Sequence, residues 1–153
     1  MDELIFRRAC REDVPRIVKL LADDQLGASR ERLTDPLAAT YLDAFAEIDG
    51  DRNQELIVVD IDRAVVGCLQ LTIIPGLSHQ GAKRAQIEAV RIDAALRRKG
   101  IGERLIRYAI ERARQRGCRL VQLTTNRSRV DAHRFYDRLG FESTHLGYKL
   151  VLE

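Results

Sequence analysis

The sequence predicts an α/β fold, of the α+β kind, in which helices flank a central mixed and twisted β-sheet. Three observations support this prediction. Short runs rich in apolar and β-branched residues recur along the chain, amphipathic segments with helical spacing separate them, and a strand, a helix and a strand follow one another in the second half. The chain has 153 residues, of which 45% are apolar and 32% charged. We therefore expect residues 1–153 to form a single globular domain.

The N-terminal third predicts one strand and two helices. Residues 4–9 are typical of a strand, and the acidic residues and proline within residues 11–15 are typical of a helix start. Residues 25–34 are polar and predict a loop. A second helix is expected to begin at Asp35-Pro36 and to end at Asp49-Gly50, because apolar residues recur there at helical spacing.

The middle of the chain predicts three strands. Residues 55–60 and 64–74 are rich in β-branched residues, and the few residues between them predict a hairpin with a tight turn. Residues 75–81 predict a longer loop. Residues 84–93 alternate between apolar and polar side chains, as expected of a fourth strand.

The last third predicts two helices and two further strands. Residues 100–116 predict an amphipathic helix capped by Gly117, and residues 120–125 predict a buried strand. Residues 130–139 predict a helix, and residues 141–152 a final strand or half of a hairpin. The order is β-α-α-β-β-β-α-β-α-β, which gives six to seven strands and about four helices. The strand–helix–strand passage implies one parallel pair in an otherwise antiparallel sheet.

Composition argues against several classes of protein. No apolar run approaches the roughly 20 residues that span a bilayer, so no membrane segment is expected. The N-terminus is acidic and lacks an apolar signal region, which favours a cytoplasmic location. The spacing of Cys10, Cys68 and Cys118 fits neither a disulfide framework nor a zinc site, and we expect no metal. The net charge is only +3, and few aromatic residues accompany the basic ones, so nucleic-acid binding is not expected.

A short basic loop with two glycines is the clearest functional feature. Arg97-Arg98-Lys99-Gly100-Ile101-Gly102 follows a predicted strand and opens the long helix. A helix N-terminus offers unpaired N–H groups with partial positive charge, and glycines let an anion approach the backbone closely. The loop therefore predicts an anion site of pyrophosphate size. A Walker loop is excluded because GxxxxGKS/T is absent, and Leu105 stands where a dinucleotide fingerprint needs its third glycine.

Two motifs together resemble the GNAT superfamily of N-acetyltransferases. Arg97-x-x-Gly100-x-Gly102 resembles the R/Q-x-x-G-x-G/A signature of that superfamily. Downstream, residues 132–141 resemble its A-x-x-F-Y-x-x-x-G-F block, and the predicted order of elements matches that fold across the chain. The resemblance implies an acyltransferase that uses acetyl-CoA as cosubstrate and moves its acetyl group to an amine.

The resemblance also implies roles for individual positions. A bulge in the fourth strand should open the sheet beside the thioester, and a backbone N–H, that of Val90, should contact the acetyl carbonyl. The backbone at Val90 and Ile92 should pair with the pantetheine arm, and the amides from Arg97 to Gly102 should hold the pyrophosphate. The cofactor-binding positions expected on this basis are Val90, Ile92, Arg97, Arg98, Lys99, Gly100, Ile101, Gly102, Asn126, His133 and Phe135.

The chemistry needs a base for the attacking amine and an acid for the leaving thiolate. Glu88 lies two residues before Val90, and strict strand alternation would put both on one face, so Glu88 is the expected base, acting directly or through water. Tyr136 resembles the general acid of the superfamily. Each has a purely structural alternative: Glu88 could pair with Arg84 or Arg91, and Tyr136 could be a core aromatic residue.

The acceptor is expected to be a small-molecule amine or an amino-acid derivative. His79, Arg84 and Gln86 are the expected substrate-contacting residues, with Arg84 placed to receive an acceptor carboxylate. The alternatives are a protein lysine or N-terminal acetyltransferase, a non-catalytic acyl-CoA-binding module, and a nucleic-acid binder that uses the arginine-rich helix. Because dimers are common in the superfamily, a homodimer is also considered, although no stretch of sequence marks an interface.

Overall fold

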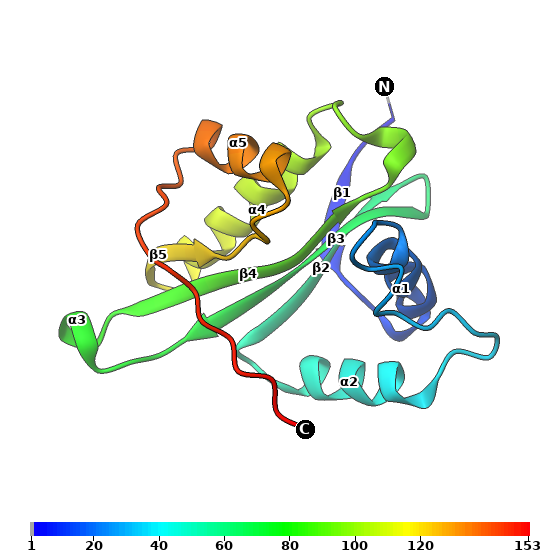
Figure 1. Cartoon of the computed structure of the whole chain (residues 1–153), viewed down its shortest axis with the longest axis horizontal. Helices are drawn as coiled ribbons and strands as arrows, with labels where there is room; N and C mark the ends of the chain where they lie inside the picture. Colours follow the sequence, from blue (N-terminus) through cyan, green and yellow to red (C-terminus); the bar gives the residue numbers. More distant parts are fainter. Residues whose placement is uncertain (1) are drawn as a thin grey trace. The chain divides into compact units, whose positions relative to one another are not determined.

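The computed structural model describes residues 2–153. Residues up to 122 form one compact unit and residues 123–153 a second, and each is described by itself. The first unit holds a sheet with the strand order β1-β2-β3-β4-β5 (Figure 1). Its strands are β1 (Ile5–Arg8), β2 (Gln54–Ile61), β3 (Ala64–Ile74), β4 (Lys83–Ile92) and β5 (Cys118–Leu123), the last reaching the boundary between the units. Its helices are α1 (Val14–Ala22), α2 (Ala39–Gly50), α3 (Ser78–Gly81) and α4 (Ile101–Gln115), with short 3-10 turns at Arg11–Asp13 and Ala94–Leu96.

The sheet is mixed. The pairs β1–β2, β2–β3 and β3–β4 are antiparallel, and the β2–β3 turn has only two residues, Asp62 and Arg63, with φ of 50° and 67°. Such left-handed turns match the twist of a hairpin. Strand β5 is reached from β4 through α4, a crossover that places the two neighbours parallel. The predicted hairpin and the predicted mixed sheet are confirmed.

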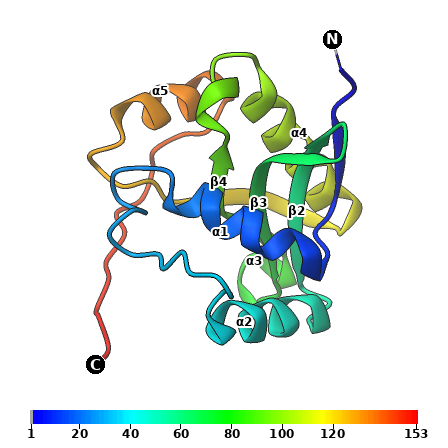
Figure 2. The same ribbon diagram turned by 90° about the vertical axis from the view of Figure 1, so that its right-hand side faces the viewer.

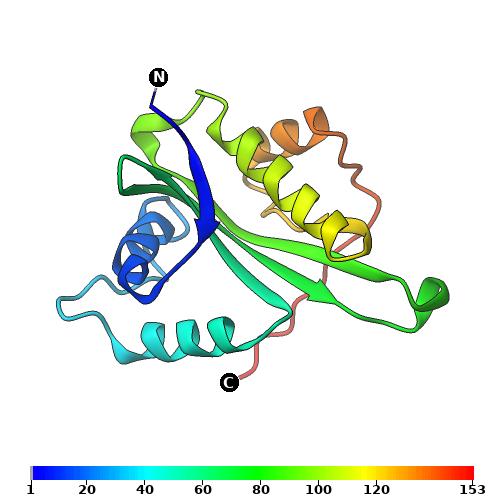
Figure 3. The same cartoon turned by 180° about the vertical axis from the view of Figure 1, so that it is seen from behind.

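Helices cover both faces of the sheet. Helices α1 and α2 pack on one face through a core that includes Ile17, Phe45 and Cys68. Figure 2 shows α1 in front of β2 and β3 and α4 behind them, and Figure 3 shows α4 across the rear face. Helix α4 buries Leu105, Ile106 and Ala109 completely, as its amphipathic sequence predicts. Its Tyr108 ring stacks on Phe6 of β1, with centroids 5.2 Å apart.

The second unit contains helix α5 (Val130–Arg138), which ends where Gly140 adopts a φ of 93°. The ring of Tyr136 on α5 makes edge contacts with Phe135 and Phe141, at centroid distances of 5.1 and 5.7 Å. The sequence motif around Phe135 and Tyr136 therefore lies on a helix that closes on a left-handed glycine.

Several predicted elements differ from the structure. The sheet has five strands rather than six to seven, because within residues 2–153 the stretch 142–153 forms no strand. Its apolar alternation is typical of a strand, but pairing with a neighbour, not the local pattern, decides whether a strand forms. The second helix begins at Ala39, not at Asp35-Pro36, and residues 35 and 36 form a bend before it. Strand β5 is not buried: Leu120 is 48% exposed.

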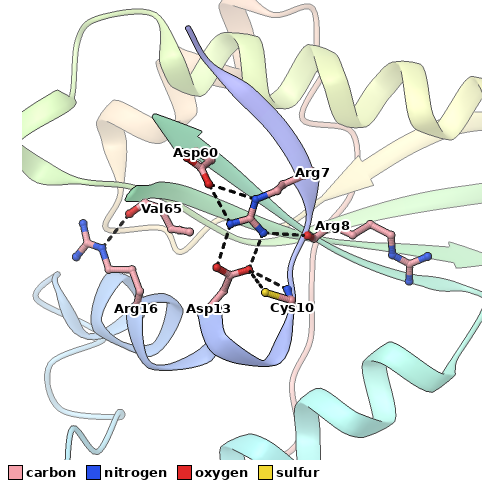
Figure 4. Close-up of polar contacts among 7 residues, drawn as sticks. All are labelled: Arg7, Arg8, Cys10, Asp13, Arg16, Asp60 and Val65. Atoms are coloured by element: carbon pink, nitrogen blue, oxygen red, sulfur yellow. Dashed lines mark hydrogen bonds and ion pairs between the residues drawn. The ribbon is translucent and has the colours of Figure 1, made fainter. Parts of the chain in front are cut away.

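A charged cluster joins β1, the start of α1 and β2 (Figure 4). The Arg7 guanidinium donates to both oxygens of Asp13, at 2.7 and 3.0 Å, and to Oδ2 of Asp60, at 3.1 Å. The backbone N–H of Cys10 also donates to Asp13, at 2.8 Å. The hydrogen bond from Arg7 lowers the pKa of Asp13 from its ordinary 3.8, against the opposing effect of burial. Asp13 therefore stabilises the fold in its charged form.

This cluster predicts a loss of stability in acid. A carboxyl whose pKa is lower in the folded state stabilises above its unfolded value, near 3.8, and loses this contribution as the pH falls through the folded value. We expect Asp13→Asn to lower the free energy of unfolding at pH 7 by about 1–3 kcal/mol, and to lessen the further loss between pH 5 and about pH 2. Urea unfolding across this range measures both effects. Asp43→Asn, which removes an exposed carboxyl on α2, should change neither.

Candidate active site

Strand β4 carries a bulge in its middle. Glu88 lies opposite Gln70 of β3, but Arg91 lies opposite Cys68, so three steps along β4 match two along β3. The surplus residue is taken up where Ala89 adopts a φ of 54°. The bulge expected in the fourth strand is thus confirmed. Because partners across a ladder share a face, Glu88 and Arg91 both point to the side of α1 and α2.

The bulge changes the argument that singled out Glu88. Strict alternation would have put Glu88 and Val90 on one face, but alternation does not continue through a bulge, and Glu88 shares its face with Arg91 instead. The Glu88 side chain is exposed and accepts a short hydrogen bond from Nε2 of Gln86. Gln86 in turn accepts from Nε2 of Gln122 on β5, at 2.9 Å. Two strand amides therefore hold the carboxylate in place.

Arg91 pairs with Asp24 rather than with Glu88. Its Nε lies 3.1 Å from Oδ2 of Asp24, in the segment after α1, and the two side chains are only 15% and 13% exposed. Nη1 of Arg91 also donates to the carbonyl of Val90, at 2.8 Å. On the other side of the bulge the Cys68 thiol donates to the carbonyl of Ala89, at 3.6 Å, and burial raises the pKa of that thiol to about 12. Side chains of the protein thus donate hydrogen bonds to the carbonyls of both Ala89 and Val90 in the bulge.

The segment after α1 and the segment after β4 are connected at further points. Arg16 of α1 lies 2.6 Å from Asp93, and Nη2 of Arg97 approaches the carbonyl of Asp23 at 3.5 Å. Sequence reasoning missed Asp24, Asp93 and Arg16, because nothing in a single sequence links residues 67 to 77 positions apart. These contacts hold α1 and the two residues after it, Asp23 and Asp24, next to the end of β4.

The glycine loop contains two residues in the left-handed region. Gly100 caps α4 with a φ of 80°, in the left-handed region, and Arg98 has a φ of 64°. A Cβ at Gly100 would meet no atom within 4 Å, so the space beside its backbone is open. Arg97, Arg98 and Lys99 are exposed, whereas Ile101 is buried and anchors the first turn of the helix. Exposed cations beside an open helix N-terminus are the arrangement that binds phosphate groups.

An apolar cavity of about 150 Å³ lies on the α1 and α2 side of the bulge. Ala89 and Gln70 line it from the sheet, and Tyr41 lines it from α2. The Tyr41 hydroxyl donates to Glu31, at 3.0 Å, and accepts the backbone N–H of Arg32, at 2.9 Å, so it also orders the end of the polar loop. The cavity was not predicted, because its apolar lining has the pattern of an ordinary core.

The predicted acceptor residues separate into two places. Gln86 lies in the hydrogen-bonded row with Glu88. His79 and Arg84 lie at the far end of the β3–β4 hairpin, where they line a second cavity. His79 and Gln80 have positive φ, of 53° and 62°, within the short helix α3.

The remaining predicted residues lie in the second unit. Asn126 follows β5, and its Oδ1 accepts from the backbone N–H and the hydroxyl of Ser128, at 3.0 and 2.7 Å. His133 contacts the carbonyl of Asn126 through Nε2, at 3.0 Å. Phe135 and Tyr136 form the aromatic group on α5. The second motif block is therefore held by contacts within its own unit.

Neither a membrane-spanning helix nor a metal-binding cluster is present within residues 2–153. Within them, no helix is long and apolar enough to cross a membrane. No group of three or more histidine, cysteine or acidic residues in that part of the chain is placed to hold a metal ion.

Comparison with known proteins gives consistent matches. A curated relative, the aminoalkylphosphonate N-acetyltransferase of Salmonella typhimurium, is 33% identical over 73% of this chain and 72% of its own. A crystal structure from Bacillus halodurans, described as a transcriptional regulator, is 48% identical, with a TM-score of 0.96 over 98% of this chain and 100% of the other. An acetyltransferase of Trypanosoma brucei is 26% identical, with a TM-score of 0.79 over 98% and 100% of the two chains.

The family model of the acetyltransferase (GNAT) family matches residues 16–141. The match takes in the bulged strand, the glycine loop and α5, which are the elements that carry the motifs described above. The chain therefore belongs to the acetyltransferase (GNAT) family and is an N-acetyltransferase.

Proposed function

We propose that this enzyme transfers the acetyl group of acetyl-CoA to the primary amine of a small molecule, by direct attack within a ternary complex. The observation that carries the proposal is the bulge in β4. Glu88 stands just before it on the α1 and α2 side, and after β4 ends at Ile92 the chain reaches the open helix N-terminus at Gly100. One continuous segment would thus supply both a base and an anion cradle.

The cofactor half of the proposal rests on the loop geometry. The amides of residues 97–102 would hold the pyrophosphate, with charge from Arg97, Arg98 and Lys99. The backbone of Val90 and Ile92 would pair with the pantetheine arm. The acetyl carbonyl accepts hydrogen bonds, so the Val90 N–H is the group assigned to it. Asn126, His133 and Phe135 keep their proposed places along the cofactor.

The chemical half assigns one proton to each of two residues. Glu88 takes the proton of the attacking amine, directly or through water, and Tyr136 gives a proton to the departing thiolate. The nitrogen–carbon bond forms as the amine attacks, and the carbon–sulfur bond breaks when the tetrahedral intermediate collapses. The amides of Gln86 and Gln122 support this role by holding the Glu88 side chain in one orientation.

The proposal that the acceptor is a small-molecule amine rests on the apolar cavity and on the Salmonella relative. The cavity beside Ala89 suits the carbon skeleton of a small amine. The relative is named for aminoalkylphosphonates, which are small amines that carry an acidic group. A lysine or N-terminal amine of a protein is the alternative acceptor, and a panel of free amines and lysine peptides separates the two.

The cofactor site is tested by calorimetric titration of acetyl-CoA into wild type and Gly100→Glu. We expect the variant to lose at least about a hundredfold in affinity, because it puts negative charge where the pyrophosphate should lie. Gly100→Ala is the matched control: it has the same unfavourable φ without the charge, so it should lose much less. Equal affinity of wild type and Gly100→Glu, or no binding by wild type, would contradict the proposal.

A second function is favoured by one finding, the description of the Bacillus halodurans protein as a transcriptional regulator. The charges of α4 weigh against nucleic-acid binding by this helix. Arg107 pairs with Glu103 at 2.8 Å and Arg114 with Glu111 at 3.4 Å, while Arg112 is bound to Glu55. Steeply salt-dependent DNA binding that persists under saturating CoA would establish the second function.

A further inference from the structure

The second cavity lies at the free end of the β3–β4 hairpin, well along β4 from the bulge. It has a volume of about 380 Å³ and lies entirely within the first unit. It is lined by Ser78, His79, Gln80, Ala82, Lys83, Arg84, Arg119 and Leu120. The lining thus comes from α3, from the first residues of β4 and from the start of β5.

The lining carries an unbalanced positive charge. Lys83, Arg84 and Arg119 are basic, His79 is titratable, and no acidic residue takes part. Within residues 2–153 no hydrogen bond or ion pair engages the side chains of these three basic residues.

Other arginines of the same unit are neutralised. Arg91 is bound to Asp24, and Arg112 and Arg116 are both bound to Glu55. Among the residues that the structure describes, Lys83, Arg84 and Arg119 have no such partner, and they line one cavity. Three unpaired basic side chains around a cavity are the arrangement that binds an oxyanion with two charges.

The backbone holds the rim of the cavity in an uncommon conformation. His79 and Gln80 are successive non-glycine residues with positive φ, which costs of order 1 kcal/mol or more each. The N–H of Gly81 closes this turn on the carbonyl of Leu77, at 3.0 Å. The turn places His79 on the cavity rather than along a regular hairpin.

We propose that this cavity binds a phosphate or phosphonate group of the acceptor amine, and that the acceptor is therefore an extended molecule. The inference rests on the proposed function, since it takes Glu88 as the place of the amine. Arg84 and Glu88 lie opposite Ile74 and Gln70 of β3 and so share a face. They are four residues apart, which is about 13 Å along a strand.

The two side chains lean the same way, toward the free end of the hairpin, so their spacing stays close to that of the strand positions. Glu88 is hydrogen-bonded to Gln86, and Nη1 of Arg84 lies 3.8 Å from where a Cβ of Gly76 would be, beside the hairpin loop. Amine and oxyanion are therefore on the order of 10 Å apart, which needs a chain of roughly nine bonds. A short aminoalkylphosphonate cannot reach both places at once.

The test compares three acceptors under saturating acetyl-CoA: ω-aminooctylphosphonate, ω-aminooctanol and aminoethylphosphonate. For wild type we expect kcat/KM for the long phosphonate to exceed that for the long alcohol by about 10- to 100-fold, mainly through KM. The combined variant Lys83→Gln/Arg84→Gln/Arg119→Gln should erase this preference, so that its kcat/KM for the long phosphonate falls to its own value for the long alcohol. Arg107→Gln/Arg114→Gln, which removes exposed cations on α4, should retain it.

A binding measurement without turnover separates failure of the inference from failure of the proposed function. Octylphosphonate is titrated in the presence of saturating CoA, which occupies the glycine loop. Wild type should bind it, and the triple variant should bind it at least about tenfold more weakly. If no amine is acetylated, the proposed function fails, and this titration alone shows whether the cavity binds a phosphonate group. Any of three results would overturn the inference. Both proteins could bind octylphosphonate equally, or the triple variant could keep its preference for the long phosphonate. The third is that the triple substitution lowers kcat/KM for aminoethylphosphonate as much as for the long phosphonate.

Discussion

Replacing Glu88 by glutamine is expected to lower kcat by about 10²- to 10⁴-fold, because the amide cannot take a proton from the amine. The side chain keeps its size, and its remaining oxygen can still accept from the Gln86 amide two residues earlier on β4, so the strand should keep its register. We therefore expect acetyl-CoA to bind the variant as tightly as wild type. Steady-state rates with the best amine of a panel, together with calorimetric titration of acetyl-CoA, measure both quantities.

The control for this substitution is Glu111→Gln, which removes a carboxylate that is 57% exposed on α4 and pairs only locally with Arg114. It should change kcat by less than about twofold, as expected for a surface ion pair. An unchanged kcat in Glu88→Gln would show that another group, or water alone, takes the proton.

Replacing Arg91 by methionine is expected to lower the free energy of unfolding by about 3–5 kcal/mol, because it leaves the Asp24 carboxylate without its cation at a site that is only 13% exposed. It also releases the Val90 carbonyl from its side-chain donor, so kcat should fall more than acetyl-CoA affinity. Urea unfolding monitors the first effect, and rates with acetyl-CoA titrations monitor the second.

The double variant Asp24→Asn/Arg91→Met makes the test specific. Two groups that stabilise each other should cost less together than the sum of the single variants, by about 0.5–3 kcal/mol. The matched surface pair is Arg107 and Glu103, 62% and 50% exposed, where Arg107→Met should cost less than about 1 kcal/mol. Strict additivity at Asp24 and Arg91 would show that the ion pair does not couple the loop to the strand.

Features set by local chemistry were predictable from sequence. The start of α4 follows from Gly100 and its end from Gly117, and both glycines adopt the left-handed conformation. The hairpin of β2 and β3 follows from β-branched runs separated by two turn residues. In these cases the residues that decide the structure are neighbours in the sequence.

Features set by distant partners were not predictable. The pairing of Arg91 with Asp24 depends on how the α1 segment folds back on β4, and no local pattern encodes it. The same is true of residues 142–153, where an alternating pattern cannot supply the neighbour that a strand needs. Glu88 was identified from its place in the strand, yet the amide row that holds it comes from β4 and β5 together.

The bulge separates the local shape of β4 from its pairing with β3. Because three steps along β4 match two along β3, removing Ala89 would restore simple alternation and leave Arg91 opposite Cys68, on the face of Glu88. Arg91 could then still pair with Asp24, but the backbone beside Glu88 would lose its kink. A single-codon deletion at Ala89 should therefore lower activity far more than it lowers stability, and more than any exchange of that alanine for another small residue. In an alignment of functional homologues, a gap should be rarer at this place than a change of residue.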